Sequence, residues 1–274
     1  MDTPGVSRRA VRADSARIIR LGARLRESGD TGRRHVWVVA HRGASGHAPE
    51  NTLAAFRRAV ELGARFIETD LHLSRDARFV AIHDDTLDRT TSGRGLVHEY
   101  ALAELREFDA GSWFDPRFAG ERIPTLDEIL QFAREHDVVF YLEIKPVAAW
   151  GVEHTLVATL RDAGEAARVV VLSFDAATLT AVRRIEPTLM TGLLFDRPGA
   201  AVRRAIEVGA RQLAPRGDQV TPDLIAEARR ADLHVVTWTI NELAHMRALL
   251  AAGVDGIMTD YPDRLLSEQS AKTT

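Results

Sequence analysis

Two carboxylates and an imidazole lie close together in one short segment of this 274-residue chain. Residues 66–73 are predicted to form a strand, in which alternation of side chains puts Glu68 and Asp70 on one face. Residues 74–78 predict a hairpin turn, and a return strand would bring His83 opposite Asp70. Adjacent carboxylates repel each other, and a divalent cation commonly offsets that repulsion. The alternative interpretation is a solvated edge hairpin with surface acids.

A third carboxylate, Glu143, follows at the end of another apolar run. With Glu68 and Asp70 it makes an all-oxygen set, which suits a hard cation such as Mg²⁺ or Ca²⁺ better than Zn²⁺. The sequence therefore predicts a divalent metal site built from neighbouring strands.

Charged and titratable groups accompany these acids. Arg42 and Lys145 follow strand-like runs and suit a phosphate, because a guanidinium fork can bind paired oxygens and an ammonium acts as a point charge. His41 and His83 are two candidate proton carriers near neutral pH. Such a combination favours acid–base chemistry on a phosphoryl group, whereas one histidine alone would more often be structural.

The elements that must position these groups alternate between strands and helices. Eight such alternations predict a closed TIM (β/α)8 barrel of the α/β class rather than an open sheet, with sites at the carboxyl ends of the strands. The predicted strands are 36–40, 66–73, 138–144, 168–173, 189–195, 210–214, 233–239 and 254–258, and the predicted helices are 51–62, 125–136, 151–164, 176–186, 199–208, 221–231 and 241–252.

Local signals mark some of these boundaries. Asn51 is a plausible N-cap and Gly63 a plausible C-terminal cap for the first helix. Thr125 and Glu128 have the spacing of a capping box and predict the start of the helix that runs to about His136.

One segment interrupts the alternation. Residues 85–124 form a long insertion after the second strand, with Trp113, Phe114 and Phe118 among polar residues. An interruption of this length in a compact barrel is usually functional or a small subdomain, so it is either a lid over the barrel mouth or an insertion with its own small core. The predicted organisation is a basic extension at 1–34 and a barrel at 35–274.

Composition limits the function classes. The chain has 45% hydrophobic residues and no cysteine, which excludes disulfides, thiolate metal sites and cysteine nucleophiles. Residues 1–34 carry nine arginines and four acids, or +5; the remaining 27 basic and 35 acidic residues give −8, which argues against nucleic-acid binding. No apolar run approaches the roughly 18 residues of a membrane span and no signal-peptide core precedes position 35, so a cytoplasmic location is expected.

The basic extension has a helical pattern of its own. Ile18, Leu21 and Leu25 share one face with arginines interleaved. It is predicted to be a short surface helix or a frayed tail, and the alternative is an amphipathic helix that makes weak contact with an anionic membrane surface or a partner.

Several motifs, in this order along residues 36–266, resemble the glycerophosphodiester phosphodiesterase family. They are His41-Arg42-Gly43-Ala44-Ser45-Gly46, Pro49-Glu50-Asn51-Thr52, Glu68-Thr69-Asp70, His83-Asp84, Leu87, Arg89-Thr90-Thr91, Ile123-Pro124-Thr125-Leu126, Glu143-Ile144-Lys145, Trp238-Thr239-Ile240-Asn241 and Gly256-Ile257-Met258-Thr259-Asp260-Tyr261-Pro262. The resemblance does not cover the first 35 residues.

The resemblance implies a TIM barrel with an insertion after the second strand. It implies a divalent metal on the three acids, His41 and His83 as the catalytic pair, and phosphate binding by Arg42 and Lys145. Members of the family cleave glycerophosphodiesters to glycerol 3-phosphate and an alcohol such as choline or ethanolamine. The attacking oxygen would come from water or from the 2-hydroxyl of the substrate.

Two further residues receive roles within this interpretation. Glu50 is predicted to orient His41 or a metal-bound water, and the alternative is a charge that complements a helix dipole. Trp238 is predicted to form an apolar wall for glycerol or the head group. Two departures from the family pattern are Ala77, where the hairpin usually has glycine, and Ala214-Pro215, where a polar residue is common; the second bears on substrate choice.

Two rival functions remain at this point. One is a related phosphodiesterase of the lysophospholipase D type, acting on lysophospholipids at a membrane. The other is a barrel that binds glycerophosphate compounds without turnover, although a pure binder needs no pair of proton carriers. The oligomeric state is not readable from the sequence.

Overall fold

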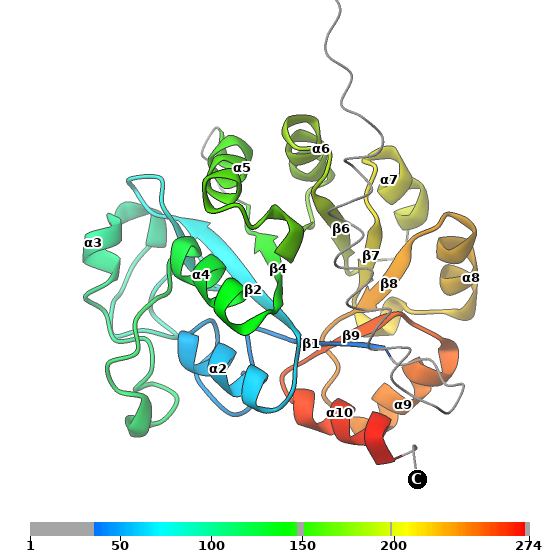
Figure 1. Ribbon diagram of the computed structural model, residues 1–274, viewed down its shortest axis with the longest axis horizontal. Helices are drawn as coiled ribbons and strands as arrows, with labels where there is room; N and C mark the ends of the chain where they lie inside the picture. The colour runs from blue at the N-terminus through cyan, green and yellow to red at the C-terminus, as the bar shows by residue number, and fades with distance from the viewer. Residues whose placement is uncertain (1–35, 147–150, 198, 272–274) are drawn as a thin grey trace, which may run out of the picture.

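The computed structural model describes residues 36–146, 151–197 and 199–271. In that part of the chain, parallel strands form a ring and helices lie outside it (Figure 1). The predictions for the basic extension at 1–34 fall outside the described residues.

The sheet of the described residues has nine strands in the order β1-β9-β8-β7-β6-β5-β4-β2-β3, and a β1–β2 pairing closes it. Eight of the strands are parallel to their neighbours, so the predicted TIM barrel is confirmed; β3 is the antiparallel hairpin partner of β2. The strands are β1 Trp37–Ala40, β2 Phe66–Leu73, β3 Phe79–Ala81, β4 Val139–Ile144, β5 Val169–Ser173, β6 Met190–Phe195, β7 Gln212–Pro215, β8 His234–Thr237 and β9 Gly256–Thr259.

The helices follow the strands as predicted, with ends shifted by a few residues. They are α2 Leu53–Glu61, α3 Leu102–Leu105, α4 Leu126–His136, α5 Val152–Ala163, α6 Ala176–Ile185, α7 Ala201–Glu207, α8 Pro222–Arg230, α9 Leu243–Ala252 and α10 Pro262–Ala271. The sequence interpretation missed α3, a short helix of the insertion, and α10, which packs near β1 and completes the helical layer after the last strand (Figure 1).

Alternation of side chains divides the core into two layers. Val38 and Ile67 point outward and pack with the helices, whereas Trp37 and Phe66 point inward and fill the barrel interior. Because Phe66 faces inward, the same alternation directs Glu68 and Asp70 into the barrel nearer the carboxyl end of β2. The apolar interior thus closes the lower part of the barrel and leaves the polar groups at its mouth.

The insertion has a small core of its own. Seven buried apolar side chains from β3 and the insertion pack together, separately from the two barrel layers: Val80, Ile82, Leu87, Val97, Leu105, Ala110 and Ile123. The segment with α3 extends to the side of the barrel beside α2 and α4 (Figure 1). Trp113, one of the aromatics that suggested a lid, is 40% exposed.

The predicted capping box at the start of α4 is present. Thr125 Oγ1 accepts a hydrogen bond from Glu128 N at 3.2 Å, and Thr125 N donates to Glu128 Oε2 at 2.8 Å. The first helix differs from its prediction, because its N-cap is Thr52 rather than Asn51. Gly63 adopts a positive φ of 97° directly after the C-cap Leu62, so the predicted glycine stop is present.

Replacing Thr125 with alanine is expected to lower the free energy of unfolding by about 1 kcal/mol, because the change leaves an amide of the first turn without its cap. Urea denaturation with and without the substitution measures this loss. Thr180→Ala is the matched control, since Thr180 is exposed and its hydroxyl donates only to a carbonyl within its own helix. Equal stabilities of the two variants would contradict the expected contribution of the cap.

Candidate active site

Three buried carboxylates meet at the mouth of the barrel. Glu68 and Asp70 come from the inward face of β2, and the parallel register places Glu143 of β4 directly beside Asp70. One oxygen from each of the three side chains lies within 4.8 Å of the others. The sequence prediction that these acids converge is therefore realised in the structure.

Two cations lie against this acidic cluster, which consists of Glu68, Asp70 and Glu143. Lys145 Nζ is 2.6 Å from Glu143 Oε1 and 2.8 Å from Asp70 Oδ1. Arg42 Nε is 3.2 Å from Asp70 Oδ2, and Arg42 N donates to Glu68 Oε2 at 2.9 Å. The backbone of Arg42 has a φ of 55°, which turns the chain after β1 so that both its amide and its guanidinium face the cluster.

Burial and mutual repulsion perturb the acids strongly. Burial, with the charge of Asp70 next in size, raises the pKa of Glu68 well above its usual range and raises that of Glu143 to about 7. For Asp70 burial acts in the same direction, but Lys145 and Arg42 outweigh it and hold the pKa well below the ordinary value. Lys145 and Arg42 therefore do not supply enough positive charge to keep all three carboxylates ionised, because the pKa values of Glu68 and Glu143 are raised.

The cluster fits a divalent cation on these observations. Its donor set is entirely carboxylate oxygen, the oxygens converge, and the penalty on ionising Glu68 and Glu143 is one that a bound cation would remove. Carboxylate donors favour a hard ion of the Mg²⁺ or Ca²⁺ kind.

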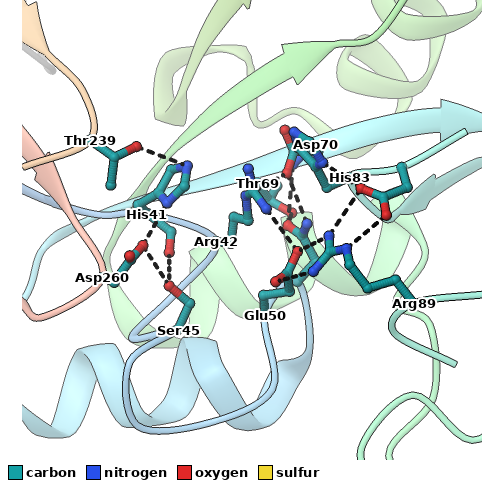
Figure 2. Close-up of polar contacts among 12 residues, drawn as sticks. His41, Arg42, Ser45, Glu50, Thr69, Asp70, His83, Arg89, Thr239 and Asp260 are labelled. Carbon is teal, nitrogen blue, oxygen red and sulfur yellow. Dashed lines mark hydrogen bonds and ion pairs between the residues drawn. The ribbon is translucent and has the colours of Figure 1, made fainter. Parts of the chain in front are cut away.

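The first imidazole forms a pair with a carboxylate from the opposite end of the chain. His41 Nδ1 and Asp260 Oδ1 are 2.7 Å apart (Figure 2). His41 Nε2 lies 4.0 Å from Glu68 Oε2. Asp260 also accepts from Ser45 Oγ at 2.9 Å and from Asn241 Nδ2 at 2.6 Å. Although burial opposes it, the contact with His41 helps to lower the pKa of Asp260 to about 2, so this carboxylate is ionised.

The second imidazole has a matching arrangement. His83 Nδ1 and Asp84 Oδ1 are 2.7 Å apart, and Asp84 in turn contacts Arg89 of the insertion (Figure 2). The backbone carbonyl of His83 lies 3.1 Å from Nε2 of the buried His72. Burial lowers the pKa of His83, and the nearby Lys145 and Arg42 act in the same direction against the effect of Asp70. Neutral His83 is the form that can accept a proton.

Glu50 lies among guanidinium groups. Its Oε1 accepts from Arg42 at 2.8 Å, and both of its oxygens accept from Arg89, at 2.8 and 2.9 Å. Burial opposes ionisation of Glu50, but Arg89 and Arg42 together lower its pKa. The sequence interpretation assigned Glu50 to His41 or to a metal-bound water, whereas the contacts that the structure gives it are with these arginines.

Trp238 directly follows β8 and packs, partly buried, against the apolar barrel interior. Its Nε1 donates to the carbonyl of Ala214 at 2.8 Å, which fixes the indole, and its ring meets that of Phe174 edge-on at 5.5 Å between centroids. Phe174 is 42% exposed and lines a cavity of about 600 Å³ at the ends of β5 and β6. Thr239, the next residue in the chain, has its Oγ1 3.4 Å from His41 Nε2.

Sequence reasoning gave no role in the site to several residues that hold it together. Asn51 donates to Asp70 Oδ2 at 2.9 Å and accepts from Thr69 Oγ1 at 2.7 Å, so it fixes the orientation of a central carboxylate. The other residues of this kind are Asp84, Arg89, Asn241 and Asp260. All five stand within motifs that carry the family resemblance, and that position is the signal that could have found them.

A closed barrel with carboxylates and imidazoles gathered at the carboxyl ends of its strands has the architecture of a TIM-barrel enzyme. Residues 41–264 match the glycerophosphoryl diester phosphodiesterase family, and the chain belongs to that family. Within the described residues, no helix combines the length and the apolarity that crossing a bilayer requires.

Known relatives cover most of the chain. It is 39% identical to a glycerophosphodiester phosphodiesterase from Caldanaerobacter subterraneus subsp. tengcongensis over 84% of this chain and 96% of the relative. An Oleispira antarctica phosphodiesterase, solved in complex with the product sn-glycerol-3-phosphate, is 31% identical with a TM-score of 0.79, over 85% of this chain and 96% of that one. The chain is also 31% identical to a glycerophosphodiester phosphodiesterase from Agrobacterium tumefaciens, with a TM-score of 0.76, over 85% of this chain and 100% of that one.

Proposed function

We propose that this protein hydrolyses glycerophosphodiesters to glycerol 3-phosphate and an alcohol, using a divalent cation and two histidines. The observation that carries the proposal is the placement of two imidazole–carboxylate pairs beside one buried acidic cluster. Membership of the family and the product bound to the Oleispira phosphodiesterase support the same reaction.

Glu68, Asp70 and Glu143 would hold the cation, which is Mg²⁺ or Ca²⁺ in this proposal. When bound, such an ion supplies positive charge that stabilises the negative charge developing on the phosphoryl oxygens. Arg42 and Lys145 lie beside the same carboxylates, within reach of an anionic oxygen next to the cluster, and would bind the phosphate.

His41 and His83 would carry the protons. In each pair Nδ1–H donates to the aspartate, a tautomer inferred from the hydrogen bond, which leaves Nε2 free for proton transfer. One imidazole removes the proton from the attacking oxygen of water or of the 2-hydroxyl as the new phosphorus–oxygen bond forms. The other protonates the leaving alkoxide as its bond to phosphorus breaks. Where the 2-hydroxyl attacks, the product is a cyclic phosphate, and water must then open its ring to give glycerol 3-phosphate.

Trp238 and Phe174 would guide the leaving alcohol. Trp238 contacts Phe174, which lines the cavity at the ends of β5 and β6, so an alcohol that leaves past these rings would enter a space lined by both apolar and charged residues. A cavity of about 600 Å³ accommodates a small head group.

A head-group panel tests the proposal. Glycerol 3-phosphate release is expected from glycerophosphocholine and glycerophosphoethanolamine, abolished by a chelator and restored by Mg²⁺ or Ca²⁺. Lysophosphatidylcholine is the comparison substrate, and a preference for it would favour the lysophospholipase D type of activity instead. Binding of these compounds without product release would contradict hydrolysis altogether.

A further inference from the structure

A single guanidinium from the insertion contacts two carboxylates of the site. Arg89 Nε and Nη2 donate to the two oxygens of Asp84 at 2.7 and 3.0 Å. Its Nη1 and Nη2 donate to the two oxygens of Glu50 at 2.9 and 2.8 Å (Figure 2). The planar fork of arginine allows such paired contacts on two partners, whereas a lysine ammonium acts as a point charge.

Each of the two carboxylates holds a different functional group. Asp84 contacts Nδ1 of His83 at 2.7 Å, so it sets the tautomer and the direction of that imidazole. Glu50 accepts from Nη1 of Arg42 at 2.8 Å, while Arg42 also faces Asp70 of the acidic cluster. Arg89 therefore contacts both the carboxylate that orients His83, the proposed proton carrier, and the carboxylate that binds Arg42, the proposed phosphate-binding residue.

This contact is distinct from a simple anchor of the insertion. Arg106 already binds the insertion to the barrel, because it donates to both oxygens of Glu128 in α4 at 2.7 and 2.9 Å. Arg89 differs from Arg106 in its partners, because both of its carboxylates contact other groups of the site, whereas Glu128 lies at the start of α4. Its four hydrogen bonds are better explained by orientation of the groups that they reach.

We propose that Arg89 is a positioning residue that orients His83 through Asp84 and Arg42 through Glu50, so that one residue of the insertion aligns proton transfer with phosphate binding. The proposal rests on the proposed function for the roles of His83 and Arg42. It gives the insertion a part in the reaction that does not require closing over the barrel mouth.

Steady-state kinetics with glycerophosphocholine tests the two paths separately. Arg89→Ala is expected to lower kcat by about 10-fold or more and to raise KM by a similar factor, because both groups lose their orientation. Asp84→Ala should lower kcat and Glu50→Ala should raise KM. In the Asp84→Ala background, adding Arg89→Ala should then change only KM, and in the Glu50→Ala background only kcat. Arg89→Lys should restore at most one of the two parameters.

Arg106→Ala is the matched control, since it removes a paired guanidinium of the same insertion that contacts no group of the site. It should lower the melting temperature and leave kcat and KM unchanged. The proposal is overturned if Arg89→Ala leaves both kinetic parameters unchanged, or if Arg106→Ala changes them as much as Arg89→Ala does.

A spectroscopic measurement separates this proposal from the proposed function. Long-range ¹H–¹⁵N correlation spectra report the tautomer of each histidine without any turnover. His83 is expected to be the Nδ1–H tautomer in the wild type and a mixture in Arg89→Ala, while His41 is unchanged. A wild type without hydrolytic activity would remove the proposed function, whereas an unaltered His83 spectrum in Arg89→Ala would remove the positioning role.

Discussion

Replacing His41 or His83 with alanine is expected to lower the rate of glycerol 3-phosphate release by about 10²–10⁴-fold, the usual contribution of a positioned acid or base. Alanine removes the nitrogen that carries the proton and leaves Asp260 or Asp84 without its imidazole partner. The double variant should lose less than the product of the two single losses, because in the proposed mechanism both histidines serve one proton-transfer sequence.

The chain offers a matched control for these substitutions. His47 Nε2 and Asp263 Oδ1 are 2.8 Å apart, so His47 has the same kind of carboxylate partner, but this pair belongs to the loop after β1 and the start of α10 and not to the acidic cluster. His47→Ala is expected to retain activity within a few-fold. Circular dichroism checks that each variant is folded, and product release that survives both His41→Ala and His83→Ala would contradict the roles proposed here.

The central part of the site could be predicted from the sequence because two simple rules fix it. Alternation along β2 determines that Glu68 and Asp70 share a face, whatever surrounds the strand. The parallel order of the barrel then brings the carboxyl end of β4, and with it Glu143, next to Asp70. The hairpin that returns His83 also followed from local turn geometry, since residues 74–78 connect β2 directly to β3.

Contacts between loops could not be predicted in this way. Asp260 reaches His41 across 219 positions of the chain, and no periodicity relates the loop after β9 to the loop after β1. Asn51 shows how local rules compete: it and Thr52 are both good N-cap residues, and Thr52 caps α2 while Asn51 serves Asp70 instead. The helix α10 was not predicted because the strand–helix alternation that defines the barrel is complete in its strands at the eighth one, before α10 begins.

The insertion illustrates a third limit. Its length and aromatic content were consistent with either a lid or a small subdomain, because exposed and buried aromatics look alike in a sequence. The structure gives residues such as Leu87 and Leu105 a separate small core, and it turns Arg89 toward the site. Neither the small core nor the contact of Arg89 with the site can be inferred from the number of aromatic residues.

Glu68→Gln is expected to abolish most of the metal-dependent activity and yet leave the metal-free protein as stable as the wild type, or more stable. The amide keeps the shape and can still accept from Arg42 N, but it removes a buried carboxylate that is repelled by Asp70 and Glu143. Without that carboxylate the cluster would lose one of its three proposed cation ligands. Thermal unfolding with a chelator and with Mg²⁺ should therefore show a large Mg²⁺-induced rise in melting temperature for the wild type and a much smaller one for the variant.

The dependence of this rise on pH follows from Glu143. Its pKa is raised from 4.5 to about 7 in the folded, metal-free protein, so its protonated form favours the folded state below pH 4.5, and this contribution is lost as pH increases through about 7. A cation competes with the same proton, so its binding strengthens over that range. The difference in melting temperature between Mg²⁺ and chelator should widen from pH 5 to pH 7.5. A difference that is constant across this range would mean that the cation does not bind at Glu143, because only a site that must lose a proton gains affinity as pH rises.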